Sequence, residues 1–389
     1  MRFIVKTLTG LENVLAEEIR ELGYPQVNVL PRGVEVEADE TFIYKGNYHL
    51  STALNILSPV QGGHLDQADA LYQVLRQVPW DQYMHLGQSF VFKPIIYSKL
   101  FPNSHYAILR AKDALVDYFR DKTGQRPNVG GQDAHIHFVL RIYEHEWELL
   151  LDSSGQPLNQ RKYRRQAGPA PINEVLAAGI LKIAGYDGKR PFLDPMCGSG
   201  TFCLEAARLA LRIPPQSLRS DFAFMYWPDH NSSLFERIKS EAVGKVLTHT
   251  AMPIMGRDKD RHILDLARQN SYLAGVAKAV RWESADFFSC GPGLEAPLVC
   301  INPPYDQRIS EERVEQFYED MGNHLKKEYT GCDIWLLSGH LEAISRIGLK
   351  PSKKVNLFNG AIPCSLRQYH LFAGRHADFK RDQSSRPSS

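Results

Sequence analysis

The sequence predicts an α/β protein, in which a doubly wound parallel sheet follows residue 172 and a smaller α+β region precedes it. Two observations support this prediction. From Asn173 onward, helix patterns alternate with short apolar strands, and a glycine-rich turn at 198–200 follows the first strand. Before residue 152, short strand and helix patterns follow one another. The 389 residues suffice for two or three domains that each bury a core.

Composition excludes several classes of protein. Hydrophobic residues make up 43% and charged residues 23%, which are ordinary globular values. No apolar run approaches the roughly 20 residues that cross a bilayer, and Phe3-Ile4-Val5 is too short for a signal peptide. We therefore expect a cytoplasmic protein without a membrane partner. The six cysteines include no C-x-x-C pair, so we expect reduced, mostly buried thiols and no metal.

The α+β region begins with a strand at Phe3-Ile4-Val5 and a helix over residues 11–22, followed by two strands that turn at Pro31-Arg32-Gly33. A helix starts near Thr41. The pair Ser58-Pro59 predicts the end of this helix, because a residue before proline disfavours the helical conformation. The remaining patterns predict a strand at 89–93, a helix at 106–120, and strands at 135–142 and 147–151.

Positive charge gathers in residues 86–126. Seven lysines and arginines, including Lys99 and Arg126, stand there against three aspartates. Four aromatic residues are interleaved with them: Phe90, Phe92, Tyr97 and Phe101. Cations neutralise phosphates and flat rings stack on unpaired bases, so the segment suits a nucleic acid. The alternative is that the cations solvate a helix face and the rings fill a core.

A basic connector over residues 156–171 joins the two regions. Residues 152–165 carry four positive charges and one negative charge. A linker of this kind can serve only as a soluble spacer. It can equally follow a phosphate backbone, because it runs between a basic module and a second domain.

The motif Asp194-Pro-Met-Cys-Gly-Ser-Gly-Thr201 follows the strand that ends at Phe192-Leu193. Its glycines let the backbone approach a ligand closely, and it is far more specific than a lone glycine turn. A second strand ends at Asp258, whose carboxylate can accept hydrogen bonds from both ribose hydroxyls. Because 64 residues separate the two acids, an insertion must lie between them, and residues 222–246 supply it.

Two later strand ends complete the pattern. Asp286-Phe287 offers a carboxylate and a ring that can flank an adenine, although each acid in the series can also be a helix cap or a surface residue. Asn302-Pro-Pro-Tyr305 follows the fourth strand. Its asparagine oxygen and the Pro303 carbonyl match the two hydrogens of an exocyclic amine, and Tyr305 can stack on the base. A methyl-donor loop and an amine clamp together indicate an amino-group methyltransferase. The alternative is a plain Pro-Pro turn.

At these motifs the chain resembles a known family, the class I S-adenosylmethionine-dependent methyltransferases of the THUMP-domain type. The resemblance is closest to the RlmL-like enzymes, which methylate guanine N2 in large-subunit (23S) ribosomal RNA. It covers nearly the whole chain, including residues 151–158, 194–201, 222–228, 302–305, 353–360 and 367–369. One departure is Arg161-Lys-Tyr-Arg164, where relatives commonly have Arg-Gly-Tyr-Arg.

The resemblance implies a ferredoxin-like region at 1–60, a THUMP RNA-binding domain at 61–155, the linker at 156–171, a Rossmann-like class I methyltransferase domain at 172–375 and a disordered polar tail at 376–389. It implies that S-adenosylmethionine is held by Asp194, Met196, Gly198, Ser199, Gly200, Thr201, Asp258, Asp286, Phe287 and Asn302. The catalytic guanine contacts would be Asn302, Pro303 and Tyr305. Expected contacts to the wider RNA are Lys99, Arg126, Arg161, Tyr163, Arg164 and Pro304. The expected partner is 23S ribosomal RNA or a large-subunit assembly intermediate.

Four other functions compete with this interpretation. Guanine-N2 methylation of a transfer RNA would use the same amine clamp. Adenine-N6 methylation of DNA would share the clamp but would not need the basic front half. Cytosine-C5 methylation needs a cysteine nucleophile at the clamp, and Cys197 and Cys300 are better explained as small buried residues. A non-enzymatic RNA-binding module that retains only the methyltransferase fold is the fourth.

Overall fold

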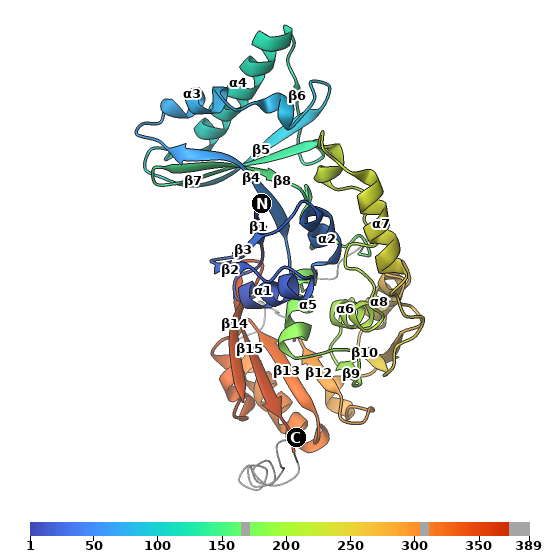
Figure 1. The fold of residues 1–389 in the computed structure, drawn as a ribbon. Helices are drawn as coiled ribbons and strands as arrows, with labels where there is room; N and C mark the ends of the chain where they lie inside the picture. The colour runs from blue at the N-terminus through green and yellow to red at the C-terminus, as the bar shows by residue number, and fades with distance from the viewer. Residues whose placement is uncertain (165–171, 304–310, 373–389) are drawn as a thin grey trace. The chain divides into compact units, whose positions relative to one another are not determined.

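The computed structural model describes residues 1–164, 172–303 and 311–372, which fold as two compact units (Figure 1). Unit 1 comprises Met1–Leu8, Glu12–Arg161 and Pro215–Gly244. Unit 2 comprises Thr9–Leu11, Lys162–Pro214 and Lys245–Ser389. The expected tail at 376–389 lies outside the described residues. No helix within the described ranges combines the length and the apolar character that a membrane span requires.

Unit 1 is built on one eight-stranded sheet with the strand order β2-β3-β1-β4-β8-β7-β5-β6. Alternate residues such as Phe3, Phe90 and Phe138 point into a core that the helices cover. The strands are β1 (Arg2–Lys6), β2 (Val27–Leu30), β3 (Gly33–Glu37), β4 (Asn55–His64), β5 (Ser89–Tyr97), β6 (Asn128–Val129), β7 (Ile136–Tyr143) and β8 (Glu146–Asp152). The helices are α1 (Glu12–Glu21), α2 (Thr41–His49), α3 (Ala70–Arg76), the short η1 (Trp80–Gln82) and α4 (Ser104–Thr123).

Strand β4 corrects one prediction. The helix that starts at Thr41 ends at His49, and Ser58-Pro59 lies inside β4 instead of at a helix end. The pairing of β4 with β8 shifts register between Pro59 and Gln61, and such an irregularity tolerates a residue without an N–H. Because β4 pairs with both β1 and β8, the sheet continues across the expected domain boundary at residue 60.

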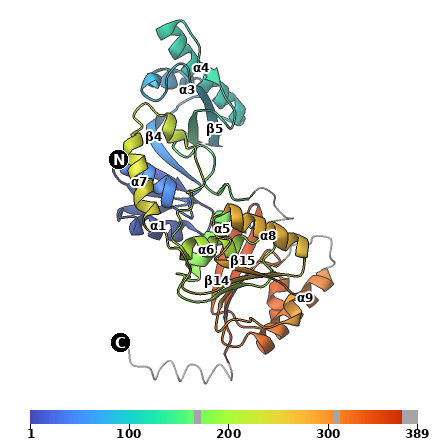
Figure 2. The ribbon, with the colours of Figure 1, turned by 90° about the vertical axis from the view of Figure 1, so that its right-hand side faces the viewer.

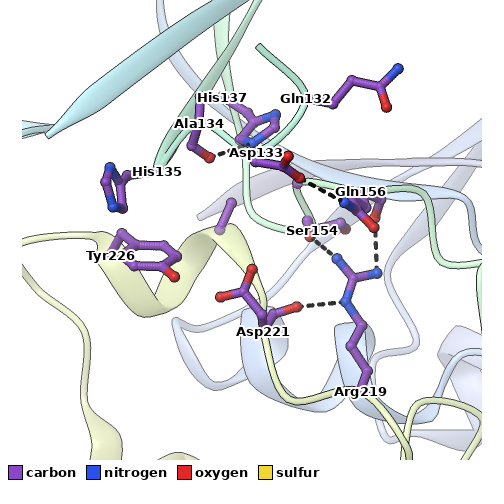
Figure 3. Close-up of a pocket in the computed structure, with 12 residues that line it drawn as sticks. Gln132, Asp133, Ala134, His135, His137, Ser154, Gln156, Arg219, Asp221 and Tyr226 are labelled. Carbon is purple, nitrogen blue, oxygen red and sulfur yellow. Dashed lines mark hydrogen bonds between the residues drawn. The ribbon is translucent and has the colours of Figure 1, made fainter. Parts of the chain in front are cut away.

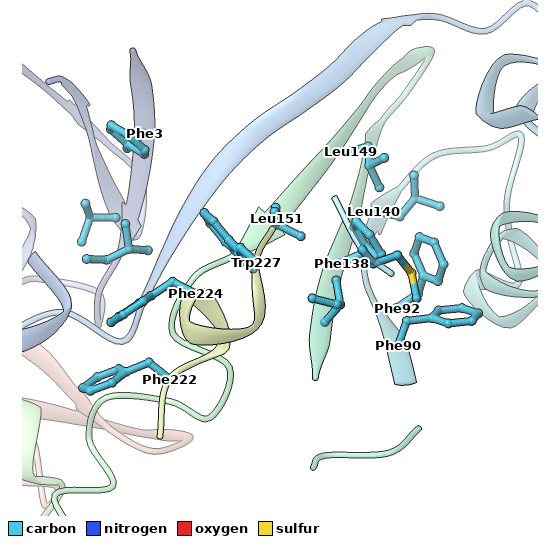
Figure 4. Packing of buried hydrophobic residues seen from close by; sticks show 14 of the residues in the cluster. Phe3, Phe90, Phe92, Phe138, Leu140, Leu149, Leu151, Phe222, Phe224 and Trp227 are labelled. Atoms are coloured by element: carbon cyan, nitrogen blue, oxygen red, sulfur yellow. The ribbon is translucent and has the colours of Figure 1, made fainter. Parts of the chain in front are cut away.

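The insertion expected between Asp194 and Asp258 is present, but it begins earlier than the expected residue 222: residues 215–244 fold with unit 1. It contains η2 (Ala223–Tyr226) and α7 (Ser232–Val243). Phe222, Phe224 and Trp227 are buried in the core of unit 1 (Figure 4). Burial of these aromatic side chains explains why the segment folds with unit 1, although the residues before and after it in the sequence belong to unit 2. Its placement in unit 1 was not predicted.

Unit 2 contains a seven-stranded sheet with the order β11-β10-β9-β12-β13-β15-β14, and this confirms the doubly wound α/β class. Strands β9 to β13 run parallel, and β15 is antiparallel to β13. The strands are β9 (Phe192–Asp194), β10 (Ile254–Asp258), β11 (Val280–Ser284), β12 (Leu298–Ile301), β13 (Asp333–Ser338), β14 (Lys353–Asn359) and β15 (Ile362–His370).

Helices cover both faces of this sheet (Figure 2). Helix α9 (Glu311–Glu328) packs Met321 and Leu325 against Leu193 and Val299 on one face, next to the short η4 (Ala343–Ile347). The opposite face is covered by α5 (Glu174–Ile183), α6 (Thr201–Ala210) and α8 (Arg261–Leu273). Burial on both faces explains why β9 and β12 are apolar without alternation.

The insertion supplies a test of its own packing. Phe224 is 1% exposed and makes edge-on contacts with Tyr44 and Phe235. We expect Phe224→Ala to lower the free energy of unfolding by about 3–5 kcal/mol, because it leaves a cavity in the core of unit 1. Urea unfolding followed by tryptophan fluorescence measures this loss. Leu218→Ala, at a residue of the same insertion that is 39% exposed, is the control and should change little. Equal effects of the two substitutions would contradict the assignment.

Candidate active site

The sheet of unit 2 reverses its winding between β9 and β12, because β10 lies on one side of β9 and β12 on the other. Open α/β sheets bind ligands at the carboxyl ends of the strands beside such a switch point. Asp194 is the last residue of β9, and Asn302 directly follows β12. The parallel register aligns Leu193 with Val299, so β9 and β12 end at the same edge of the sheet on neighbouring strands about 4.8 Å apart, and Asn302 lies two residues beyond the position opposite Asp194.

Hydrogen bonds hold the loop that follows β9. The Gly198 N–H donates to Oδ2 of Asp258 at 2.9 Å, which ties the loop to the end of β10. The Asn270 side chain donates to the Ser199 carbonyl at 3.2 Å, and Nη2 of Arg164 donates to Oγ1 of Thr201 at 2.6 Å. Three distant segments thus fasten one short loop. Sequence reasoning missed Asn270, whose only signal is a polar residue at a buried position of α8.

The two loop glycines have different reasons to be glycine. Gly198 has φ +52°, and a Cβ placed on it would meet no atom within 4 Å, so its backbone faces open space. Gly200 has φ +87°, and a Cβ there would lie 2.5 Å from the ring of Trp282. Close approach of a ligand therefore suits Gly198, whereas Gly200 makes room for a tryptophan on β11. No motif pointed to Trp282.

Asp194 is an isolated buried acid. It is 2% exposed, and its Oδ1 accepts the Met196 N–H at 3.1 Å. Burial raises the pKa of Asp194 well above its usual value, the Met196 hydrogen bond opposes this, and the nearby Asp258 carboxylate adds to it. No lysine or arginine of the described residues forms an ion pair with Asp194. An ionised Asp194 would be stabilised by a cationic ligand, which is the charge of both a sulfonium and an α-ammonium group.

Asp258 and Asp286 both already accept backbone hydrogen bonds. Oδ1 of Asp258 accepts the Asp260 N–H at 3.0 Å, and Asp286 caps η3 (Phe287–Ser289) by accepting the Phe288 N–H at 2.8 Å. Carboxylate oxygens retain further lone pairs for a ligand. The ring of Phe287 is 4% exposed and packs in the core, whereas Phe288 is 39% exposed. The accessible ring at this strand end is therefore that of Phe288, and a contact of Phe287 with an adenine stays a prediction.

At the amine clamp, Asn302 is half-buried and Pro303 is buried. Pro304 and Tyr305 lie outside the described residues. Cys197 and Cys300 are buried, and burial raises the pKa of both thiols, which disfavours the thiolate that a cytosine-C5 mechanism would need. All six cysteines are free thiols, and five of them are buried. The described residues include no group of three or more metal-ligating side chains suited to an ion.

The expected contacts to the wider RNA fall into two groups. Lys99 and Arg126 are exposed. Arg161 and Tyr163 are enclosed instead: Arg161 is 1% exposed and donates to the Ser51 carbonyl, and the buried Tyr163 hydroxyl donates to Glu205 at 2.8 Å. Arg164 braces Thr201 and lies 3.5 Å from Glu174. The connector residues therefore have packing roles in the structure.

The aromatic residues of the basic segment divide in the same way. Phe90, Phe92 and Phe101 fill the core of unit 1, as the alternative interpretation held. Tyr97 is 65% exposed.

Comparisons with known proteins agree with this architecture. Residues 161–368 match the family model of the RMKL-like methyltransferase domain, residues 2–57 match the RlmL ferredoxin-like domain and residues 66–152 match the THUMP domain. A putative RNA methyltransferase of Synechocystis sp. is 32% identical over 93% of this chain and 95% of its own length. The ribosomal RNA large subunit methyltransferase K/L of Psychromonas ingrahamii is 31% identical over 97% of this chain.

The chain spans 51% of the Psychromonas protein, so it corresponds to about half of that relative. Among solved structures, a putative methyltransferase complexed with SAH superposes with a TM-score of 0.86 at 25% identity, over 96% of this chain and 99% of the other. The loop at the end of β9 and the strand order of unit 2 are consistent with these matches to methyltransferases. The chain belongs to the RMKL-like methyltransferase family and carries an RlmL ferredoxin-like domain and a THUMP domain ahead of its methyltransferase domain.

Proposed function

We propose that this protein transfers a methyl group from S-adenosylmethionine to the exocyclic N2 of a guanine in 23S ribosomal RNA. One observation carries the proposal: the buried acid of the β9 loop and the Asn-Pro turn after β12 lie on neighbouring strands at one sheet edge. The K/L relatives named for large-subunit ribosomal RNA support this choice of substrate. The structure with SAH supports the cofactor.

The residues of the loop suit the charges of this cofactor. The backbone at Gly198 leaves space for its methionine part, and Asp194 and Asp258 supply negative charge beside the cationic groups. Asp258 also has oxygens for the ribose hydroxyls, with Asp286 and the accessible Phe288 ring beside the adenine. S-adenosylmethionine, when bound, supplies a methyl carbon activated by the sulfonium.

The Asn302 turn orients the acceptor. The side-chain oxygen of Asn302 and the Pro303 carbonyl accept the two N–H bonds of the guanine amine, which aims its lone pair at the methyl carbon. The turn is stiff because proline fixes its backbone. No strong base is required before transfer, since the amine loses its proton readily once methylation has made it cationic. The proposed role of the protein is therefore positioning and charge.

Mapping the modified base tests the substrate. Purified protein with radiolabelled S-adenosylmethionine should label 23S ribosomal RNA, and mass spectrometry of the digested RNA should find N2-methylguanine. Labelling of transfer RNA alone, or of N6 of adenine in DNA, would replace this proposal with one of the alternatives.

Asn302→Ala tests the clamp. We expect kcat to fall about a hundredfold or more, because the amine loses its alignment, while the Kd for S-adenosylmethionine stays within a few-fold. Single-turnover methylation and isothermal titration calorimetry measure the two quantities. Asn28→Ala, at an exposed position of β2, is the matched control and should leave both unchanged. Wild-type turnover in Asn302→Ala would remove Asn302 from the clamp.

Asp194→Asn tests the charge of the cofactor loop. The raised pKa means that ionised Asp194 lowers stability as the pH rises through that pKa, so the neutral asparagine should raise the Tm of the cofactor-free protein at neutral pH. The same change should weaken S-adenosylmethionine binding more than tenfold at neutral pH by removing the charge partner. Wild-type affinity should fall as the pH drops, because a protonated acid cannot pair with a cation, and Asp194→Asn should lose this dependence.

Calorimetry and thermal melts across pH 5 to 8 measure both effects of Asp194→Asn. Asp265→Asn, at an exposed acid of α8, is the control for general charge. Lower stability together with unchanged cofactor affinity would refute the assigned role of Asp194.

A further inference from the structure

A polar pocket of about 210 Å³ lies within unit 1 (Figure 3). Its walls come from the loop between β6 and β7, the turn after β8 and the insertion at 215–244. The insertion interrupts the methyltransferase segment in sequence, yet it supplies Arg219, Asp221 and Tyr226 to this pocket. Nothing in the proposed mechanism uses these residues.

The buried guanidinium of Arg219 at the pocket is held by three backbone carbonyls. Nε, Nη1 and Nη2 of Arg219 donate to the carbonyls of Asp221, Gln156 and Ser154 at 2.6, 2.9 and 2.5 Å. Desolvation lowers the pKa of Arg219 to about 10. Each of its three nitrogens donates to one carbonyl, so Arg219 fastens the insertion to the turn after β8, and the residue is only 7% exposed.

Three of the remaining side chains that line the pocket offer hydrogen-bond acceptors: Asp133, Asp221 and His137. Asp133 and Asp221 are exposed at the pocket, and neither forms an ion pair with a described residue. Nε2 of His137 donates to the Ala134 carbonyl at 2.7 Å, so Nδ1 carries a lone pair. This Nδ1 is buried and has no hydrogen-bond partner among the described residues. Burial lowers the pKa of His137, and the nearby Lys93 charge lowers it further, which keeps the ring neutral. The pocket therefore favours a ligand that donates N–H groups.

Two rings form a wall for a planar ligand. The rings of His135 and Tyr226 meet edge to face, with centroids 4.7 Å apart. A hydrogen-bonding interaction with Asp221 raises the pKa of Tyr226, so the hydroxyl end of this ring lies at the carboxylate. A flat ligand stacked on either ring would bring its edge to the acceptors. Stacking on aromatic side chains is the usual way in which proteins hold unpaired bases.

We propose that this pocket holds one unpaired RNA base that bears an exocyclic amine, with Asp221 accepting its N–H groups and the Tyr226 ring stacking on its face. The proposal rests on the proposed function in so far as that function makes RNA the substrate. The carboxylates repel phosphates, so the pocket selects a base edge and adds specificity instead of general affinity. An arginine side chain of a ribosomal protein offers similar donors, but it would make less use of the two rings.

A comparison of cytosine with uracil tests whether the pocket requires an exocyclic amine, because cytosine has an amine where uracil has a carbonyl. The probes are fluorescent 12-nucleotide oligomers of cytidine and of uridine, bound to the full chain at fixed salt and measured by anisotropy. We expect wild-type protein to bind the cytidine oligomer about tenfold more tightly. Asp221→Ala should remove most of this preference. Removing a negative charge otherwise strengthens binding to a polyanion, so a loss of affinity for cytidine runs against the general electrostatic trend.

Two further variants keep the test clear. Asp113→Ala, at an exposed acid of α4, carries the same charge change outside the pocket and should preserve the preference. Tyr226→Leu should weaken binding of both oligomers by removing the stacking surface. Thermal melts check that each variant is folded; if Asp221→Ala melts early, Tyr226→Leu and Asp221→Asn decide the question.

Several outcomes would overturn the proposal. The first is equal affinity of the wild-type protein for the two oligomers. The second is a loss of preference in Asp113→Ala as large as that in Asp221→Ala. The third is an Asp221→Ala loss of affinity that is seen only with ribosomal particles that contain protein. The last result would indicate an arginine. Methylation of 23S ribosomal RNA is measured separately. If the protein methylates this RNA but shows no base preference, only the role proposed for the pocket is refuted. If it shows the base preference but does not methylate this RNA, only the proposed function is refuted.

Discussion

The parallel pairing of β9 with β12 is the constraint on which the site depends. It brings a carboxylate and an asparagine, which are more than a hundred residues apart in sequence, to the ends of neighbouring strands at one sheet edge. The hydrogen bond from Gly198 to Asp258 then ties the loop after β9 to β10, the neighbour on the other side. The ends of three adjacent strands thus meet at one sheet edge, and helices cover both faces of the sheet. The buried Asp194 shows the energetic cost of this arrangement, because burial raises its pKa well above the usual value and no lysine or arginine of the described residues forms an ion pair with it.

The insertion at 215–244 lies within the methyltransferase sequence, but it folds in the unit that contains the THUMP domain. Its aromatic residues complete an apolar core, and Arg219 secures its first turn to three backbone carbonyls. A segment held this firmly can present Asp221 and Tyr226 in a defined geometry. The pocket that we propose to hold an RNA base and the strands that carry the proposed methyl-transfer site are thereby encoded in interleaved stretches of one chain, and neither unit corresponds to a single continuous segment.

Much of the site could be predicted from sequence because local signals were strong. Apolar strands ended in Asp194, Asp258 and Asn302, and parallel strands place their ends at one edge. Other features depend on tertiary contacts. Trp282 fills the space left by Gly200 and by Gly256, its partner in the β10–β11 register, and only the folded structure shows these contacts. Ser58-Pro59 suggested a helix end, but pairing with two strands overrode the local preference. The exposed ring is Phe288 instead of Phe287, because a single turn of η3 rotates neighbouring side chains by a large angle.

The path of the chain also affects the order in which the protein is built. The chain leaves unit 1 after Arg161, forms β9 and α6 in unit 2, and returns to unit 1 at Pro215. During synthesis, the core around Phe222 and Phe224 stays incomplete until the ribosome has passed residue 244, although the rest of unit 1 emerged long before. Apolar surface of the nascent front half is exposed during that interval, when chaperones and misfolding compete for it. Maturation of this enzyme is therefore not a simple succession of domains from the amino terminus.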